Sequence, residues 1–233
     1  MNALSNPGLL ALWERGSNLH PLDQGLLALT AALPDQPPDG IADWPLGRRN
    51  RALAELHCSC FGSTLQACTA CPSCSEKMEF EMDVRTLMSE APNSGATIEV
   101  DGRTFRLPTS RDVAAATREP DPVAAANRLL LRCMMGADDS PNWSEEELER
   151  VGDKMALADP MAEFRLSLLC PACNQRWDET LDIAGFLWAE IDARARRLLW
   201  EIHTFASAYG WTEAEVLSLS TARRARYLEM IRT

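Results

Sequence analysis

Four of the eight cysteines lie in two Cys-Pro-x-Cys motifs, "CPSC" at Cys71–Cys74 and "CPAC" at Cys170–Cys173. Placing Cys71 on Cys170 also aligns "MDV" at 82–84 with "LDI" at 181–183. A Cys-x-x-Cys motif brings two thiolates close enough to share one ion, and tetrahedral zinc takes four such ligands. Each motif supplies half of a site. The repeat therefore predicts one structural zinc ion, bound by Cys71, Cys74, Cys170 and Cys173.

Other interpretations of the two motifs are two unrelated thiol pairs, a site that has lost its metal, and a redox pair. A thioredoxin-like redox pair needs a strand before the motif and a helix after it. Here strand-like patterns follow both motifs, which disfavours redox chemistry. A catalytic zinc ion keeps one open position and uses His or carboxylate ligands. A closed site of four thiolates therefore indicates a scaffold and not a catalyst.

The remaining cysteines are Cys58, Cys60, Cys68 and Cys133. With His57, the run "HCSC" and Cys68 could form a second metal site. However, Cys58 and Cys60 lie in a helical pattern, where positions two apart face different ways. Cys68 could also replace Cys71 as a ligand, but the symmetry of the two Cys-Pro-x-Cys motifs favours Cys71.

The elements that must position these cysteines are short strands. Residues 76–84, "EKMEFEMDV", alternate apolar and charged side chains, which is typical of a half-buried strand. Residues 96–108 predict a hairpin with Asp101-Gly102 as its turn. We expect an α+β fold, mostly helical, with a small central zinc-ribbon sheet built from the two distant motifs.

Five regions follow from these patterns. They are an N-terminal helical region (1–65), the first zinc knuckle with its hairpin (66–108), a helical insertion (109–160), the second knuckle with its strands (161–185) and a C-terminal helical region that resembles a helix-turn-helix (186–233). The helical regions are marked by caps, such as Asp121 followed by Pro122, and by Gly210 at a helix end.

Composition excludes several classes of protein. The chain has 233 residues and a formal charge of −11, which disfavours binding to nucleic acid or to anionic lipid. Its longest apolar stretches fall far short of the roughly 20 residues of a membrane span. The N-terminus shows no basic leader followed by a long apolar region. We therefore expect a cytoplasmic protein without a membrane partner, and reduced cysteines.

No motif for catalysis is evident. The three histidines, His20, His57 and His203, have no plausible nucleophile or paired carboxylate nearby in sequence. No nucleophile elbow and no glycine-rich phosphate loop occurs. We expect a protein that is not an enzyme.

The C-terminal region suggests a binding surface. Its arginines near the start of the last helix favour a helix-turn-helix that binds DNA, but residues 186–233 hold seven arginines against six carboxylates. This balance is poor for binding phosphates. The alternative is a surface for an acidic protein partner, with Tyr209, Trp211, Arg223, Arg224, Arg226 and Tyr227 as candidate contacts.

The order of motifs resembles a known family. "WPLGRRNRALAEL" precedes "CPSC", then come "FRLPTSRDVAAA" and "DPVAAANRLLLRC", and "CPAC" leads to "EIHTFASAYGWTEAEVLSLSTARRARYLEMI". This order is similar to zinc-ribbon proteins encoded with contractile phage tails and phage-tail-like injection systems. These are grouped with the T4-type phage baseplate protein and baseplate hub assembly chaperone family.

The resemblance implies a non-catalytic role in assembling the baseplate or tail, with baseplate, hub, spike or tape-measure proteins as partners. Of the functional residues, it carries over only the four zinc ligands. The alternative is a zinc-ribbon, helix-turn-helix regulator that binds nucleic acid.

Overall fold

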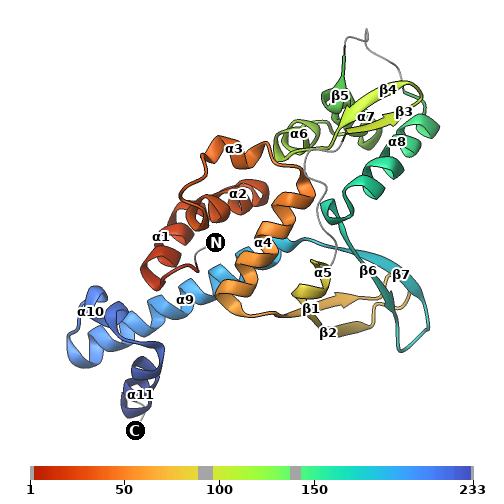
Figure 1. Cartoon of the computed structure of the whole chain (residues 1–233). Coiled ribbons are helices and arrows are strands. Elements are labelled where there is room, and N and C mark those ends of the chain that lie inside the picture. Colours follow the sequence, from red (N-terminus) through yellow and green to blue (C-terminus); the bar gives the residue numbers. More distant parts are fainter. Residues whose placement is uncertain (1–2, 89–96, 137–142, 232–233) are drawn as a thin grey trace.

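The computed structural model describes residues 3–88, 97–136 and 143–231, which form an α+β structure of helices and small antiparallel sheets (Figure 1). In chain order the elements are α1 (Asn6–Gly16), α2 (Pro21–Ala32), α3 (Pro38–Ala42), α4 (Leu46–Phe61), β1 (Thr64–Ala70), β2 (Lys77–Asp83), α5 (Val84–Leu87), β3 (Thr97–Val100), β4 (Arg103–Arg106), α6 (Ser110–Ala116), α7 (Pro122–Cys133), β5 (Met134–Met135), α8 (Glu145–Ala158), the 3₁₀ turn η1 (Pro160–Ala162), β6 (Phe164–Leu169), β7 (Arg176–Leu181), α9 (Ile183–Tyr209), α10 (Glu213–Ser218) and α11 (Thr221–Ile231). Within these ranges, no helix is both long and apolar enough to cross a membrane.

A helical body of α1, α2, α4 and α9 holds the main core. Leu29, Leu53, Leu56 and Ile191 are all 0% exposed within it. The 27 residues of α9 begin after Asp182, whose carboxylate accepts a hydrogen bond from the Ala184 N–H. Because α9 is longer than the body it packs against, its C-terminal part projects and carries α10 and α11 (Figure 1).

Two separate hairpins carry the Cys-Pro-x-Cys motifs. Strand β1 pairs with β2, β6 pairs with β7, and no pairing joins the two hairpins within the described ranges. The prediction of a single central sheet is therefore wrong, because the strands of each of these hairpins pair only with each other. Side chains connect the two hairpins instead, since the Thr69 hydroxyl donates to Glu179 Oε2 at 3.2 Å. The predicted alternation in β2 is confirmed, because the half-buried Met78, Phe80 and Met82 alternate with the exposed Lys77, Glu79 and Glu81.

The insertion has a small core of its own. Strands β3, β4 and β5 form one sheet, which packs with α7 and α8 around Phe105, Trp143 and Met155. The predicted turn at Asp101-Gly102 is confirmed by positive φ angles of 52° and 76°. The predicted region 66–108 placed this hairpin with the first zinc knuckle. The structure places it with the insertion, because β4 also pairs with β5 and buries Phe105 in the second core.

Residues at both ends of the insertion accept hydrogen bonds from the first turn of α4. The Leu46 N–H donates to the Pro108 carbonyl at 3.0 Å, and the Gly47 N–H donates to Asp159 Oδ2 at 2.8 Å. The residue before α4 is Pro45, which offers no side-chain cap, so Asp159 caps the helix from the far end of the insertion. Gly47 is required here, because any Cβ at this position would overlap the Asp159 carboxylate.

Candidate metal centre

The first knuckle is a tight turn at the tip of the β1–β2 hairpin. The Cys71 N–H donates to the Glu76 carbonyl and the Ser75 N–H donates to the Cys71 carbonyl, both at 2.9 Å. Ser75 has a φ angle of 61°, in the left-handed region. These bonds curl the chain so that the thiols of Cys71 and Cys74 point to the same side.

The second knuckle, at the tip of β6–β7, repeats this turn. The Cys170 N–H donates to the Gln175 carbonyl at 2.9 Å, and the Asn174 N–H donates to the Cys170 carbonyl at 3.0 Å. Asn174 has a φ angle of 58°. Asparagine tolerates this conformation better than most residues. The sequence repeat therefore corresponds to a repeat of backbone geometry.

The two knuckles bring all four predicted ligands together. The Sγ atoms of Cys71, Cys74, Cys170 and Cys173 all lie within 4.8 Å of one another. The Cys71–Cys173 and Cys74–Cys170 sulfur distances, which join the two hairpins, are both 3.6 Å. A tetrahedron of zinc–sulfur bonds of about 2.3 Å separates its sulfurs by about 3.8 Å. The four thiols therefore fit a tetrahedral metal ion and are too far apart for disulfides.

Each knuckle contributes one buried and one exposed ligand. Cys71 and Cys170 are 2% and 0% exposed, whereas Cys74 and Cys173 are exposed. The Ser73 N–H also donates to Cys71 Sγ at 3.4 Å, a contact that favours a thiolate. Four sulfur ligands complete a tetrahedron, so this arrangement has no open position for a substrate or a reactive water.

The pKa values of Cys71 and Cys74 are shifted in opposite directions. Burial raises the pKa of Cys71, but hydrogen bonds from the N–H groups of Cys74 and Ser73 and from the thiols of Cys173 and Cys74 together outweigh burial and lower it to about 7. The Glu76 N–H lowers the pKa of Cys74, yet the neighbouring thiols and burial raise it to about 12. One thiolate forms readily and discourages the next, because like charges repel. A bound divalent cation removes this conflict by stabilising all four thiolates.

No family model, curated protein or solved structure matches the chain. Membership of the baseplate family thus stays a prediction from the order of the motifs. The cysteine cluster, in contrast, is supported by the distances between the four sulfur atoms.

The other cysteines lie elsewhere. Cys60 Sγ accepts the Leu4 N–H at 3.4 Å, and Cys133 is buried in the second core, where burial raises its pKa to about 12. Cys68 is exposed on β1 and is not part of the cluster, so it does not replace Cys71. Across the described part of the chain, the four cysteines form the only cluster of three or more His, Cys, Asp or Glu side chains that could hold a metal ion, and His57 belongs to no second site.

The predicted partner-binding aromatics gather at the projecting end of α9. Trp211 lies 5.0 Å from both Tyr209 and Tyr227, measured between ring centroids, and all three stack around the buried Phe205. Tyr209 is 42% exposed, while Trp211 and Tyr227 are half-buried. The cluster therefore serves as the core of the C-terminal helices and leaves one aromatic edge at the surface.

The predicted arginines separate into two kinds. Arg223 and Arg226 are exposed, but Arg224 is 1% exposed, and its Nε donates to Glu201 Oε2 at 2.9 Å. The structure corrects the assignment of Arg224 to a partner surface: it is an internal residue that fastens α11 to α9. The sequence reasoning missed its partner Glu201, although a carboxylate within the apolar run "LLWEIHTF" was a usable signal.

Proposed function

We propose that the four cysteines hold one structural zinc ion in a ribbon-like arrangement of two hairpins. The observation that carries this proposal is the clustering of four thiols at distances that suit tetrahedral zinc. The thiols come from knuckles that lie far apart in the chain. A zinc ion here links the hairpin that follows α4 to the hairpin that precedes α9. The chain between the two knuckles, which contains the insertion, then forms a closed loop.

On this scaffold, the protein acts as a non-catalytic assembly factor or minor structural component of the baseplate or tail of a contractile phage tail or phage-tail-like injection system. Three features support this role: the order of motifs in the sequence, a metal site without an open position, and a C-terminal unit that projects from the helical body (Figure 1). The projecting unit exposes Tyr209, Arg223 and Arg226, which suit an acidic partner surface.

Co-expression with the baseplate, hub, spike and tape-measure proteins of the same gene cluster tests this role. We expect one of them to co-purify, and the Arg223→Glu/Arg226→Glu variant to lose it because both positions are exposed. Arg118→Glu, which changes an exposed arginine within the insertion, is the control and should retain the partner. Normal particle assembly by the double variant would contradict the proposed docking surface.

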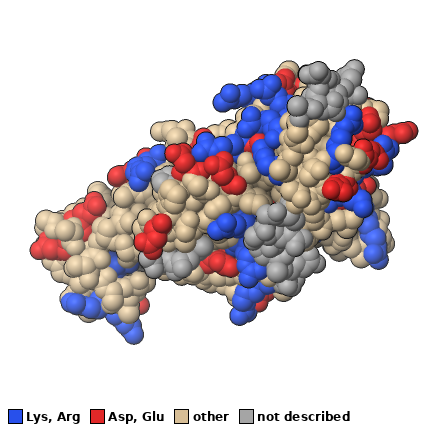
Figure 2. Space-filling model, turned by 45° about the horizontal axis from the view of Figure 1, so that its top comes forward, with Lys and Arg blue, Asp and Glu red and all other residues tan. Residues whose placement is uncertain are grey.

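Nucleic-acid binding is the second candidate, favoured by the exposed Arg223 and Arg226 near the start of α11. Against it, Arg224 is buried, and on the face shown in Figure 2 basic side chains are interspersed with acidic ones. Binding to duplex DNA that weakens steeply with salt would favour this candidate over the first.

A further inference from the structure

The four cysteines of the cluster differ in how far solvent reaches them. Cys74 and Cys173 are exposed, whereas Cys71 and Cys170 are 2% and 0% exposed. A cysteine that binds a metal does so as a thiolate, and the thiolates that solvent reaches are the ones most open to oxidation. Each knuckle therefore carries one cysteine that a dissolved oxidant can reach and one that is shielded from it.

Each exposed sulfur also touches a buried sulfur of the other knuckle. Cys74 Sγ lies 3.6 Å from Cys170 Sγ, and Cys173 Sγ lies 3.6 Å from Cys71 Sγ. A cysteine that has been oxidised to a sulfenic acid condenses with a neighbouring thiol to form a disulfide. The buried cysteine of the opposite knuckle is in place to serve as that neighbour.

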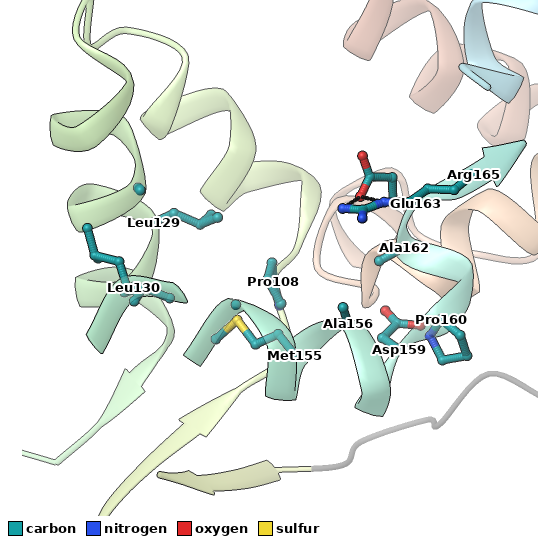
Figure 3. Close-up of a pocket in the computed structure, with 13 residues that line it drawn as sticks. Pro108, Leu129, Leu130, Met155, Ala156, Asp159, Pro160, Ala162, Glu163 and Arg165 are labelled. Atoms are coloured by element: carbon teal, nitrogen blue, oxygen red, sulfur yellow. Dashed lines mark hydrogen bonds and ion pairs between the residues drawn. The ribbon is translucent and has the colours of Figure 1, made fainter. Parts of the chain in front are cut away.

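The two hairpins are fixed at their roots. Leu65 at the start of β1 and the facing pair of Phe164 and Leu181 in β6–β7 are buried in the main core. Glu163 and Arg165 form an ion pair at 2.7 Å where η1 leads into β6, beside the cleft that α7 and α8 line (Figure 3). These contacts hold the base of each hairpin to the rest of the molecule.

The tips of the hairpins are not held in this way. Residues 72–76 and 171–176 are exposed throughout. A disulfide requires its two sulfurs to approach to about 2.05 Å, which is closer than the present contacts. The tips can make this movement without disturbing the main core, because the buried contacts lie at the roots.

We propose that Cys74 and Cys173 are sites of oxidation by peroxides, and that oxidation replaces the zinc ion with two disulfides, Cys74–Cys170 and Cys71–Cys173. The inference rests on the proposed zinc site. Both disulfides join the two hairpins, so the chain between the knuckles stays a closed loop after the metal has left. The reaction is a stoichiometric response to the oxidant and not a catalytic redox cycle.

Each disulfide consumes one molecule of hydrogen peroxide. The Cys74 thiolate attacks one peroxide oxygen, the O–O bond breaks, and the departing hydroxide takes a proton from solvent to become water. The Cys170 thiolate then attacks Cys74 Sγ, the S–S bond forms as the S–O bond breaks, and the second hydroxide also becomes water. The two sulfurs lose two electrons and the peroxide gains them. Cys173 and Cys71 react in the same way.

Zinc takes no part in the electron transfer, because it has no redox chemistry in proteins. It leaves because its ligands must be thiolates, and a disulfide sulfur is not one.

Peptide mapping without reduction tests the proposal on the zinc-loaded full chain, with hydrogen peroxide as the probe and free thiols alkylated before digestion. Trypsin releases one knuckle in peptide 52–77 and the other in peptide 166–176. We expect peroxide to join these peptides through Cys74–Cys170 and Cys71–Cys173, assigned by fragmentation, and to release one zinc ion per chain. Any other pairing of the four cysteines would overturn the proposal, including disulfides within each motif.

Hydrogen exchange shows whether the oxidised tips stay ordered. The N–H groups of Cys71 and Cys170 close the two turns. We expect both to stay protected in the oxidised, zinc-free protein and to lose protection when a chelator removes zinc from the reduced protein. Equal exchange in the two zinc-free forms would contradict a link that outlasts the metal.

Zinc content before treatment separates this proposal from the zinc site on which it rests. A chain that binds no zinc when the metal is supplied would overturn both. A chain that binds zinc and keeps it in peroxide would overturn only the oxidation.

Two variants locate the reacting cysteines. Cys74→Ser should lose the Cys74–Cys170 link and still form Cys71–Cys173. Cys68→Ser removes an exposed thiol of the same tryptic peptide that lies outside the cluster, and it is the matched control. It should form both links, and a Cys68→Ser protein without them would contradict the assignment.

Discussion

The hairpin tips and the helical body differ in how they exclude water. Of residues 71–76 only Cys71 is buried, and of residues 170–176 only Cys170 is buried. In the body, by contrast, Leu29, Leu53 and Ile191 are completely buried in one continuous core. The same chain thus contains a region with ample apolar packing and a region with almost none.

This difference indicates two sources of stability. Each fully buried Leu or Ile side chain contributes about 1.5–3 kcal/mol, so the body needs no cross-link. The tips bury too little apolar surface to compensate for the conformational entropy that they lose on ordering. A metal ion can supply that difference, because structural zinc contributes about 10–16 kcal/mol of apparent binding free energy in small zinc peptides.

Removing one buried ligand should give the largest effect. We expect Cys71→Ser to lose the zinc ion and, with it, the order of both hairpin tips. The helical body should remain folded because its core does not include the tips. Zinc content by mass spectrometry and hydrogen exchange, residue by residue, measure these two outcomes. Two results would contradict separate sources of stability for the two regions. One is a variant that keeps one zinc ion per chain, and the other is a variant whose helical body unfolds together with the hairpin tips.

Breaking the buried ion pair in the helices should have the next largest effect. Arg224→Met removes the buried partner of Glu201 and leaves only the exposed Arg197, which donates to Oε1, so we expect a cost below the roughly 3–5 kcal/mol of a fully unpaired buried charge. Hydrogen exchange should increase in α10 and α11, while zinc content stays unchanged. Arg224→Met combined with Glu201→Leu should recover much of the loss, since no buried charge remains. A single variant as stable as the wild type would show that the pair is not needed.

An acidic transition should distinguish the insertion, where Asp112 lies on α6, from both regions. Burial raises the pKa of Asp112, but hydrogen bonds from Arg106 and Thr109 outweigh it and lower the pKa to about 2. Because the folded pKa lies below the unfolded one, Asp112 stabilises the fold above about pH 4, and this contribution disappears as the pH falls towards 2. We expect it to be about 2–3 kcal/mol.

The difference in urea unfolding between wild type and Asp112→Asn, measured from pH 2 to 6, isolates this carboxylate from the acid release of zinc. The gap between the two proteins should be full at pH 6 and small at pH 2. A gap that does not change with pH would mean that the loss comes from packing and not from charge.

The smallest effect is expected at Cys68. Cys68→Ser changes an exposed thiol that lies outside the cluster, so zinc content should be unchanged and stability should stay within about 0.5 kcal/mol. It is the matched control for Cys71→Ser, three residues away in the same hairpin. Loss of zinc in this variant would mean that Cys68, and not Cys71, completes the site.

The cysteine cluster could be predicted from the sequence because the geometry of each knuckle is local. Each Cys-Pro-x-Cys turn is set by bonds within six residues, so the repeat in sequence predicts the repeat in structure, and the gathering of the four thiols is confirmed. Zinc as the bound ion stays a proposal. The strand alternation around Phe80 was equally local, as was the turn at Asp101-Gly102.

What sequence patterns missed depends on contacts between distant segments. The hairpin 97–106 belongs to the second core because β5 pairs with it, and the two residues of β5 carry no strand signal of their own. Arg224 resembles its exposed neighbours in sequence, and only the packing of α11 on α9 buries it against Glu201. Asp159 capping α4 joins residues 112 positions apart, which no local pattern indicates.

X-ray absorption at the zinc edge of the purified protein tests most directly whether the two hairpins hold one ion together. The proposed site predicts one zinc ion per chain with four sulfur neighbours at about 2.3 Å and no nitrogen or oxygen neighbour in the first coordination sphere. A mixed sphere with two sulfurs, or a folded protein whose purified form binds no zinc when the metal is supplied, would contradict it.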